Sequence, residues 1–214
     1  MSLELATEQR CLFGDVDPGV DSSFLECRRT ELAEGAWIEH QQCWLTGHQV
    51  VFDELVQVVR WEQQRRPMYN RIVDVPRLIG AMPDLGSIDL AVSASLCAAR
   101  AAIEARHEAS FDRIGVALYR TGRDSVAWHG DTVARDLPQA MVATVSLGEP
   151  RKFVLRPQGR GASLRFDLGH GDLLVMGGTC QRTWEHAVPK VAHAGPRIVV
   201  MFRPSLTSTP PVTG

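Results

Sequence analysis

The second half of the chain consists of short apolar segments separated by turn residues, and this spacing restricts the fold more than any other sequence feature. Turn-forming groups such as His170-Gly171-Asp172 recur from Arg113 onward. Short strands at such regular intervals predict a β-sandwich, a barrel or a jelly roll. The segments expected to be strands are RIGVALYR, MVATVSLG, RKFVLRP, ASLRFDLG, DLLVMGG, RTWEHAVP and RIVVMFRP.

The first half of the chain has a different texture and predicts fewer strands. Residues 24–32 and 36–45 have strand-like composition, whereas 48–64 and 90–107 carry apolar residues at helical spacing. Residues 65–78 contain two prolines and predict an ordered loop or a short strand. We therefore expect an α+β protein that is mainly β, with two supporting helices.

Composition restricts the classes of partner. The net charge of −2 gives no general attraction to nucleic acid, although a local basic groove is compatible with it. The longest weakly polar run is shorter than the roughly 20 residues that cross a bilayer, and MSLELATEQR has no apolar segment typical of a signal peptide. The five cysteines are scattered and predict reduced thiols. These features favour a cytoplasmic protein without a membrane partner or an obligate protein partner.

The stretch AWHGD places a histidine and an aspartate two residues apart, at His129 and Asp131. On a strand, residues i and i+2 share a face, so both side chains can point to one metal ion. His186 is the natural third ligand, and two histidines with one carboxylate suit a first-row divalent metal. The pattern H-x-D also arises by chance in hydrogen-bonded loops. The other histidines are interpreted as structural: His40, His48, His107, His170 and His193.

The last strand carries an arginine at each end of one face. Parity places Ile198, Val200 and Phe202 on the core side and Arg197, Val199, Met201 and Arg203 on the other. Six strand residues span about 20 Å and an arginine side chain reaches roughly 6–7 Å. Two inward arginines can therefore contact both ends of a small dicarboxylate. The alternative is a pair of solvated arginines at the strand ends.

Taken together, His129-Gly130-Asp131, His186 and the Arg197–Arg203 strand resemble the iron(II)/2-oxoglutarate dioxygenases, specifically the AlkB-like branch that acts on alkylated nucleic acids. The segments VSLGEPRKFVLRP, GDLLVMGGTCQRTWEHAVPK and GPRIVVMFRP support the resemblance, which covers about residues 65–204.

The resemblance implies a double-stranded β-helix, or jelly roll, as the fold. It divides the chain into an N-terminal extension (1–86) that includes a substrate lid at about 65–80, a dioxygenase core (87–204) and a flexible tail (205–214).

The resemblance also implies roles for individual residues. Arg197 would bind the distal carboxylate of 2-oxoglutarate with help from the Tyr119 hydroxyl, and Arg203 would lie near the other end of this cosubstrate. O₂ would be the second cosubstrate. The Fe(II) ligands would be His129, Asp131 and His186.

Three positions depart from the family pattern. Ala117 stands where the family usually has Asn, and Val199 and Met201 stand where it tends to have Asn and Thr. These changes are compatible with cofactor binding, but they alter the hydrogen bonds expected around 2-oxoglutarate and bear on the substrate class.

The reaction that the resemblance implies is oxidative dealkylation of N-alkylated bases in DNA or RNA. Hydroxylation of the alkyl group would release an aldehyde, succinate and CO₂. A flipped base needs aromatic or apolar contacts, for which Tyr69 and Trp128 are candidates. Arg71, with Arg65 and Arg66, would contact phosphates.

Two other functions fit the same residues. A 2-oxoglutarate oxygenase that acts on a small molecule or a protein side chain fits the acidic net charge, Val199 and Met201. A jelly-roll metal-binding module without turnover fits the metal ligands but leaves the Arg197–Arg203 pair without a role.

Overall fold

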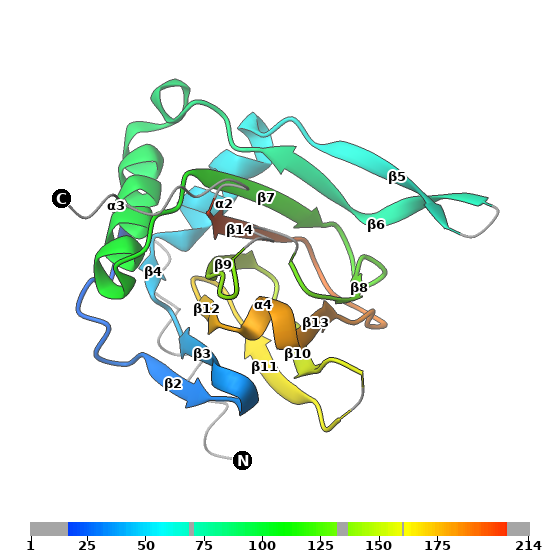
Figure 1. The fold of residues 1–214 in the computed structure, drawn as a ribbon. Helices are drawn as coiled ribbons and strands as arrows, with labels where there is room; N and C mark the ends of the chain where they lie inside the picture. Colours follow the sequence, from blue (N-terminus) through cyan, green and yellow to red (C-terminus); the bar gives the residue numbers. More distant parts are fainter. Residues whose placement is uncertain (1–16, 69–70, 132–136, 160, 205–214) are drawn as a thin grey trace, which may run out of the picture.

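Two antiparallel β-sheets form the centre of this computed structural model, which describes residues 17–68, 71–131, 137–159 and 161–204 (Figure 1). The major sheet has eight strands in the order β2-β3-β12-β9-β14-β7-β6-β5, and the minor sheet has four in the order β11-β10-β13-β8. The major-sheet strands are β2 (Arg28–Glu31), β3 (Ala36–Gln41), β5 (Glu62–Met68), β6 (Arg71–Ala81), β7 (Arg113–Tyr119), β9 (Val142–Gly148), β12 (Leu173–Gly178) and β14 (Arg197–Arg203). The minor-sheet strands are β8 (Val126–His129), β10 (Arg151–Pro157), β11 (Leu164–Leu168) and β13 (Trp184–Val188).

From β7 onward the chain passes back and forth between the two sheets. The strands β7, β9, β12 and β14 belong to the major sheet, and the chain changes sheet after every strand except β10, which is followed by β11 in the same minor sheet. Inward residues of both sheets, such as Val142, Leu155 and Leu174, form one buried cluster between them. This topology is a double-stranded β-helix, so the predicted fold class is confirmed.

Two helices cover the outer face of the major sheet (Figure 1). The helix α2 (His48–Val58) contributes Val51 and Leu55 to a buried cluster with strand residues such as Val200, and α3 (Leu90–His107) contributes Ile103. The helix α3 begins at Leu90 because the Asp89 side chain accepts hydrogen bonds from the N–H groups of Ala91 and Val92.

The predicted helix 48–64 was too long, and residues 65–78, predicted as an ordered loop or a short strand, lie mostly in the strands β5 and β6. The helix α2 ends at Val58, and β5 and β6 form an antiparallel hairpin at the edge of the major sheet. Polar residues occupy β5 because an edge strand faces solvent, so it lacks the alternation that marks a strand. Pro76 lies where the register between the two strands shifts, so its missing N–H costs no ladder hydrogen bond.

Other boundaries also changed. The predicted strand 24–32 is ordered as a strand only at β2, and 36–45 divides into β3 and β4 (Leu45–Thr46), which pairs with β1 (Gly19–Val20). Residues 180–183 form the short helix α4 (Cys180–Thr183) before β13. Three-residue helical turns also occur at η1 (Ala33–Gly35) and η2 (Leu85–Ser87).

The boundary at 86/87 stays a prediction, although β2, β3, β5 and β6 pair within the same sheet as the core strands. The tail 205–214 lies outside the described residues.

Cys27, Cys97 and Cys180 are free whereas Cys43 is disulfide-bonded, so the expectation of reduced thiols was wrong at Cys43. Within the described residues, no helix has the length and hydropathy needed to cross a membrane.

Candidate metal centre and adjoining cavity

The minor sheet brings His129, Asp131 and His186 together. Each offers one ligand atom, and these atoms all lie within 4.8 Å of one another. His129 is the last residue of β8 and is the direct cross-strand partner of His186 on β13, with ring centroids 4.3 Å apart. The structure thus unites the three residues that the sequence indicated.

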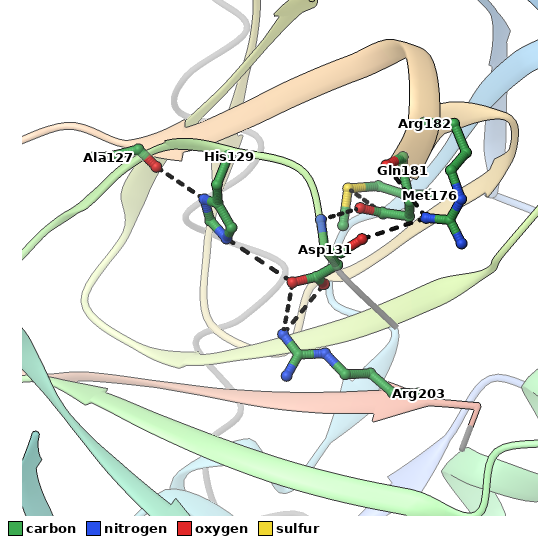
Figure 2. Close-up of polar contacts among 7 residues, drawn as sticks. All are labelled: Ala127, His129, Asp131, Met176, Gln181, Arg182 and Arg203. Atoms are coloured by element: carbon green, nitrogen blue, oxygen red, sulfur yellow. Dashed lines mark hydrogen bonds and ion pairs between the residues drawn. The ribbon is translucent and has the colours of Figure 1, made fainter. Parts of the chain in front are cut away.

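The sequence analysis placed Asp131 on the same strand as His129. In the structure β8 ends at His129, so Asp131 lies just beyond the strand. Its backbone N–H donates to the Gln181 side-chain oxygen at 2.9 Å, and Arg203 donates to both of its carboxylate oxygens at 3.2 Å (Figure 2). A Cβ on Gly130 would lie 2.9 Å from the Gln181 carbonyl oxygen, so only glycine fits between the two ligands without displacing α4.

Hydrogen bonding fixes which nitrogen of His129 faces the site. Its Nδ1 lies 2.8 Å from the Ala127 carbonyl oxygen, which can only accept, so Nδ1 carries the proton (Figure 2). The Nε2 lone pair is therefore free to bind a cation, and Nε2 lies 3.9 Å from an oxygen of Asp131.

His186 lies in an apolar environment. Its ring stacks on Phe153 with centroids 5.2 Å apart, and only 6% of the residue is exposed. Burial, reinforced by His129 and opposed by Asp131, lowers the pKa of His186 to about 3. The imidazole is therefore neutral near pH 7, which is the form that binds metals.

Arg197 is buried without a carboxylate partner among the described residues. Its Nη2 donates to the Ser146 hydroxyl at 2.8 Å, whereas Nε and Nη1 are buried and have no hydrogen-bond partner in the described part of the chain. Burial lowers the pKa of this guanidinium. Unpaired buried donors on a cation are costly unless an anion satisfies them, so Arg197 is suited to a carboxylate ligand.

Arg203 has a different environment from Arg197, although both lie on the same face of β14. Its Nη2 contacts Asp131, and its Nε is buried without a partner among the described residues. Arg203 therefore lies at the metal end of the cavity.

One cavity joins the metal ligands to Arg197. Ala117, Val199 and Met201, the three departures from the family pattern, contribute apolar surface to its wall. Sequence reasoning missed Ser146 and Arg77, because their positions depend on the pairing of β9 with β14 and of β6 with β7. The lining comprises Arg77, Ala117, Tyr119, Val126, His129, Asp131, Thr144, Phe153, Leu168, Met176, His186, Val188, Arg197, Val199, Met201 and Arg203.

Among the described residues, none of those predicted to contact the substrate lines this cavity. Trp128 lies outside its lining, and the Arg156 guanidinium carbon lies 4.0 Å from the centroid of the Trp128 ring. Arg65 is exposed and pairs with Asp74 at 3.0 Å. Tyr69 and the side chains of Arg66 and Arg71 lie outside the described part of the structure, so their roles stay predictions.

A double-stranded β-helix that holds two histidines and a carboxylate near a buried, unpaired arginine defines an oxygenase of the iron(II) and 2-oxoglutarate class. Residues 26–208 match the 2OG-Fe(II) oxygenase superfamily, and the chain belongs to this family. Family membership implies Fe(II), 2-oxoglutarate and O₂. The nitrogen and carboxylate ligands fit Fe(II), and the free N–H groups of Arg197 fit a carboxylate of 2-oxoglutarate.

Relatives confirm the predicted resemblance to the AlkB-like branch. The chain is 30% identical over 171 residues to "Alpha-ketoglutarate-dependent dioxygenase alkB homolog 3" of Bos taurus, covering 72% of this chain and 60% of that protein. It is 38% identical over 117 residues to "DNA oxidative demethylase ALKBH2" of Arabidopsis thaliana, covering 44% and 37%. The chain therefore spans about 60% or less of the length of these relatives.

Solved structures share the fold at low sequence identity. A 2OG-Fe(II) oxygenase family oxidoreductase from Burkholderia pseudomallei superposes with a TM-score of 0.53 at 14% identity, covering 87% of this chain and 90% of that one. A prolyl hydroxylase from Trichoplax adhaerens gives 0.54 at 12% identity, covering 95% and 92%.

Proposed function

We propose that this protein is an Fe(II)/2-oxoglutarate-dependent dioxygenase that dealkylates N-alkylated bases in DNA or RNA. Hydroxylation of the alkyl group would release an aldehyde, the free base, succinate and CO₂. The observation that carries the oxygenase assignment is the cavity that joins the three metal ligands to the unpaired N–H groups of Arg197. The printed names of the relatives, an alkB homologue and a DNA oxidative demethylase, support the substrate class.

In this proposal the residues of the chain bind and orient the reactants. His129, Asp131 and His186 hold the metal, whose chemistry when bound is to bring the keto acid and O₂ together for oxidation of the alkyl group. Arg197 binds the distal carboxylate. Apolar wall residues such as Val199 keep water away from the methylene groups of the cosubstrate and so strengthen this ion pair.

A groove of about 490 Å³ beside the metal centre is suited to a polyanionic substrate and supports the proposal of a nucleic acid. It is lined by Arg203, which also lines the metal cavity, and by Arg113, its direct partner across β14 and β7. Arg113 is exposed and makes no ion pair with any described residue. Like charges placed opposite each other in a sheet are unfavourable, and a bound phosphate removes the penalty.

The test is turnover on a panel of methylated single- and double-stranded DNA and RNA oligonucleotides, with formaldehyde and repaired base measured by mass spectrometry. We expect base repair coupled to succinate formation, and no turnover by His129→Ala. Succinate formation without repair of any oligonucleotide would contradict the substrate class and favour a small molecule or a protein side chain. Iron binding without 2-oxoglutarate binding would contradict the oxygenase assignment and favour a metal-binding module.

A further inference from the structure

Arg151 is a second buried arginine near the cavity, although it does not line it. It is the first residue of β10 and is only 3% exposed. Its guanidinium donates to three backbone carbonyls: Thr121 at 3.3 Å, Asp124 at 2.8 Å and Pro189 at 2.7 Å. The first two carbonyls belong to the connection between β7 and β8, and the third follows β13. One side chain thus ties the segment that leads to His129 to the segment that leaves His186.

The Tyr119 ring lies close to both Arg151 and Arg197. The guanidinium carbons lie 5.7 Å and 5.3 Å from the centroid of its ring. The nearby Asp124 carboxylate is already engaged by Arg120, whose Nε and Nη2 donate to it at 2.8 and 2.9 Å. Burial lowers the pKa of both Arg151 and Arg197. Two buried guanidiniums close to one ring, neither paired with a described carboxylate, favour an anion at this end of the cavity.

We propose that Arg151 is a positioning residue for the distal carboxylate of 2-oxoglutarate. It packs on the Tyr119 ring and adds a positive charge near Arg197, without touching the cosubstrate itself. Arg197 supplies the direct contact through its free Nε and Nη1. This inference rests on the proposed oxygenase function but not on the identity of the primary substrate.

The test compares two ligands on Mn(II)-loaded protein by calorimetry. 2-Oxoglutarate carries a distal carboxylate, whereas oxalate binds through metal chelation alone. We expect Arg151→Met to weaken 2-oxoglutarate about tenfold or more, and to leave oxalate and Mn(II) affinity within about twofold. With iron, KM for 2-oxoglutarate should rise while kcat at saturation is retained. Arg151→Lys keeps the charge and should lose less affinity than Arg151→Met.

Lys152→Met is the matched control, because it removes an exposed positive charge from the next position of the same strand; its affinities should equal those of the wild type. Unchanged 2-oxoglutarate affinity in folded Arg151→Met, or equal loss of both ligands, would overturn the inference. If Arg151→Met does not fold, a smaller loss of affinity that is confined to 2-oxoglutarate is required of Arg151→Lys. Wild-type protein that binds oxalate but not 2-oxoglutarate would contradict the oxygenase function as well, whereas a failure to dealkylate bases would contradict only the substrate class.

Discussion

Arg197 lies in the core with its Nε and Nη1 unsatisfied, and the consequence of this placement can be measured. Arg197→Met removes the charge that a distal carboxylate needs. We expect 2-oxoglutarate affinity to fall about 100-fold, in line with the loss of one partner of a buried ion pair. Metal affinity should stay within about twofold.

Thermal unfolding offers an independent measurement for the same variant. 2-Oxoglutarate should raise the unfolding temperature of the Mn(II)-loaded wild type and should not raise that of Arg197→Met. Arg28→Met, on the exposed strand β2, is the control and should respond like the wild type. Equal stabilisation of all three proteins by 2-oxoglutarate would contradict the assignment of Arg197.

Arg203 should show the opposite pattern, because it donates to both oxygens of Asp131. Removing such an outer partner of a metal ligand typically costs about tenfold in metal affinity. We therefore expect Arg203→Met to weaken Mn(II) binding about tenfold, with any loss of 2-oxoglutarate affinity following from the loss of metal. Titration of each ligand at saturating concentrations of the other separates the two effects. A selective loss of 2-oxoglutarate with normal metal affinity would instead place Arg203 at the cosubstrate.

His129 and Asp131 could be predicted as a pair from their local spacing, and Arg197 from the parity of the last strand. His186 is distant in sequence and followed from the expected jelly-roll fold, which brings early and late strands side by side. Gln181, which holds the Asp131 backbone, and Ser146, which accepts from Arg197, could not be predicted. Their roles depend on where α4 and β9 lie in space, and a glutamine or serine carries no sequence signal for that. Tyr119 could be predicted only through the resemblance, since one buried tyrosine on a strand is ordinary.

Among the elements, α3 is tied to the sheet by a buried carboxylate. Glu39 on β3 is 3% exposed and accepts from Arg106 at 2.8 Å, with His107 Nε2 at 3.4 Å and Arg29 Nη1 at 3.6 Å. Desolvation is the largest single influence and raises the pKa of Glu39, but the hydrogen bonds and charges of His107 and Arg106 together outweigh it, and this pKa falls from 4.5 to about 2. The Cys27 thiol lies 3.6 Å from the same carboxylate.

A carboxyl group with a lowered pKa stabilises the fold above its unfolded pKa and loses that contribution as pH falls through its folded pKa. Wild-type stability should therefore exceed that of Glu39→Gln at pH 7, and the difference should shrink between pH 4.5 and about 2. Urea unfolding of both proteins over this pH range measures the difference in their free energies of unfolding. A difference that stays constant with pH would show that the charge of Glu39 is not what holds α3.

The elements also show why one sequence prediction was wrong. The pattern after Val58 continues with polar residues that suit the exposed face of a helix, yet 62–68 pairs with β6. Helical periodicity is a local signal, whereas pairing at a sheet edge is set by a partner strand that follows later in the chain. The strands from β7 onward, except β8, were predictable because turn residues separate short segments of strand-like composition. β8 is only partly buried and was not among the predicted segments.

At the scale of the whole molecule, a net charge of −2 coexists with a groove beside the metal centre that is lined by Arg60, Arg113 and Arg203. The groove beside the metal is open at Gly115, where a Cβ would meet only the tip of Met201 at 3.7 Å. Its other lining includes Ala81, the direct partner of Gly115 across β6 and β7. A larger side chain at Gly115 can therefore fill the groove without displacing the backbone.

If the substrate strand lies in this groove, Gly115→Leu should raise KM for a methylated oligonucleotide by about tenfold or more, since each excluded base contact is worth roughly 1–3 kcal/mol. The slow formation of succinate without oligonucleotide and the affinity for 2-oxoglutarate should both be unchanged in Gly115→Leu.

Arg113→Gln should raise KM for the oligonucleotide and make this KM less dependent on salt concentration, because one phosphate contact is lost. Arg123→Gln removes an exposed charge from the turn after β7 and serves as the control. Unchanged KM in both groove variants would place the substrate outside this groove.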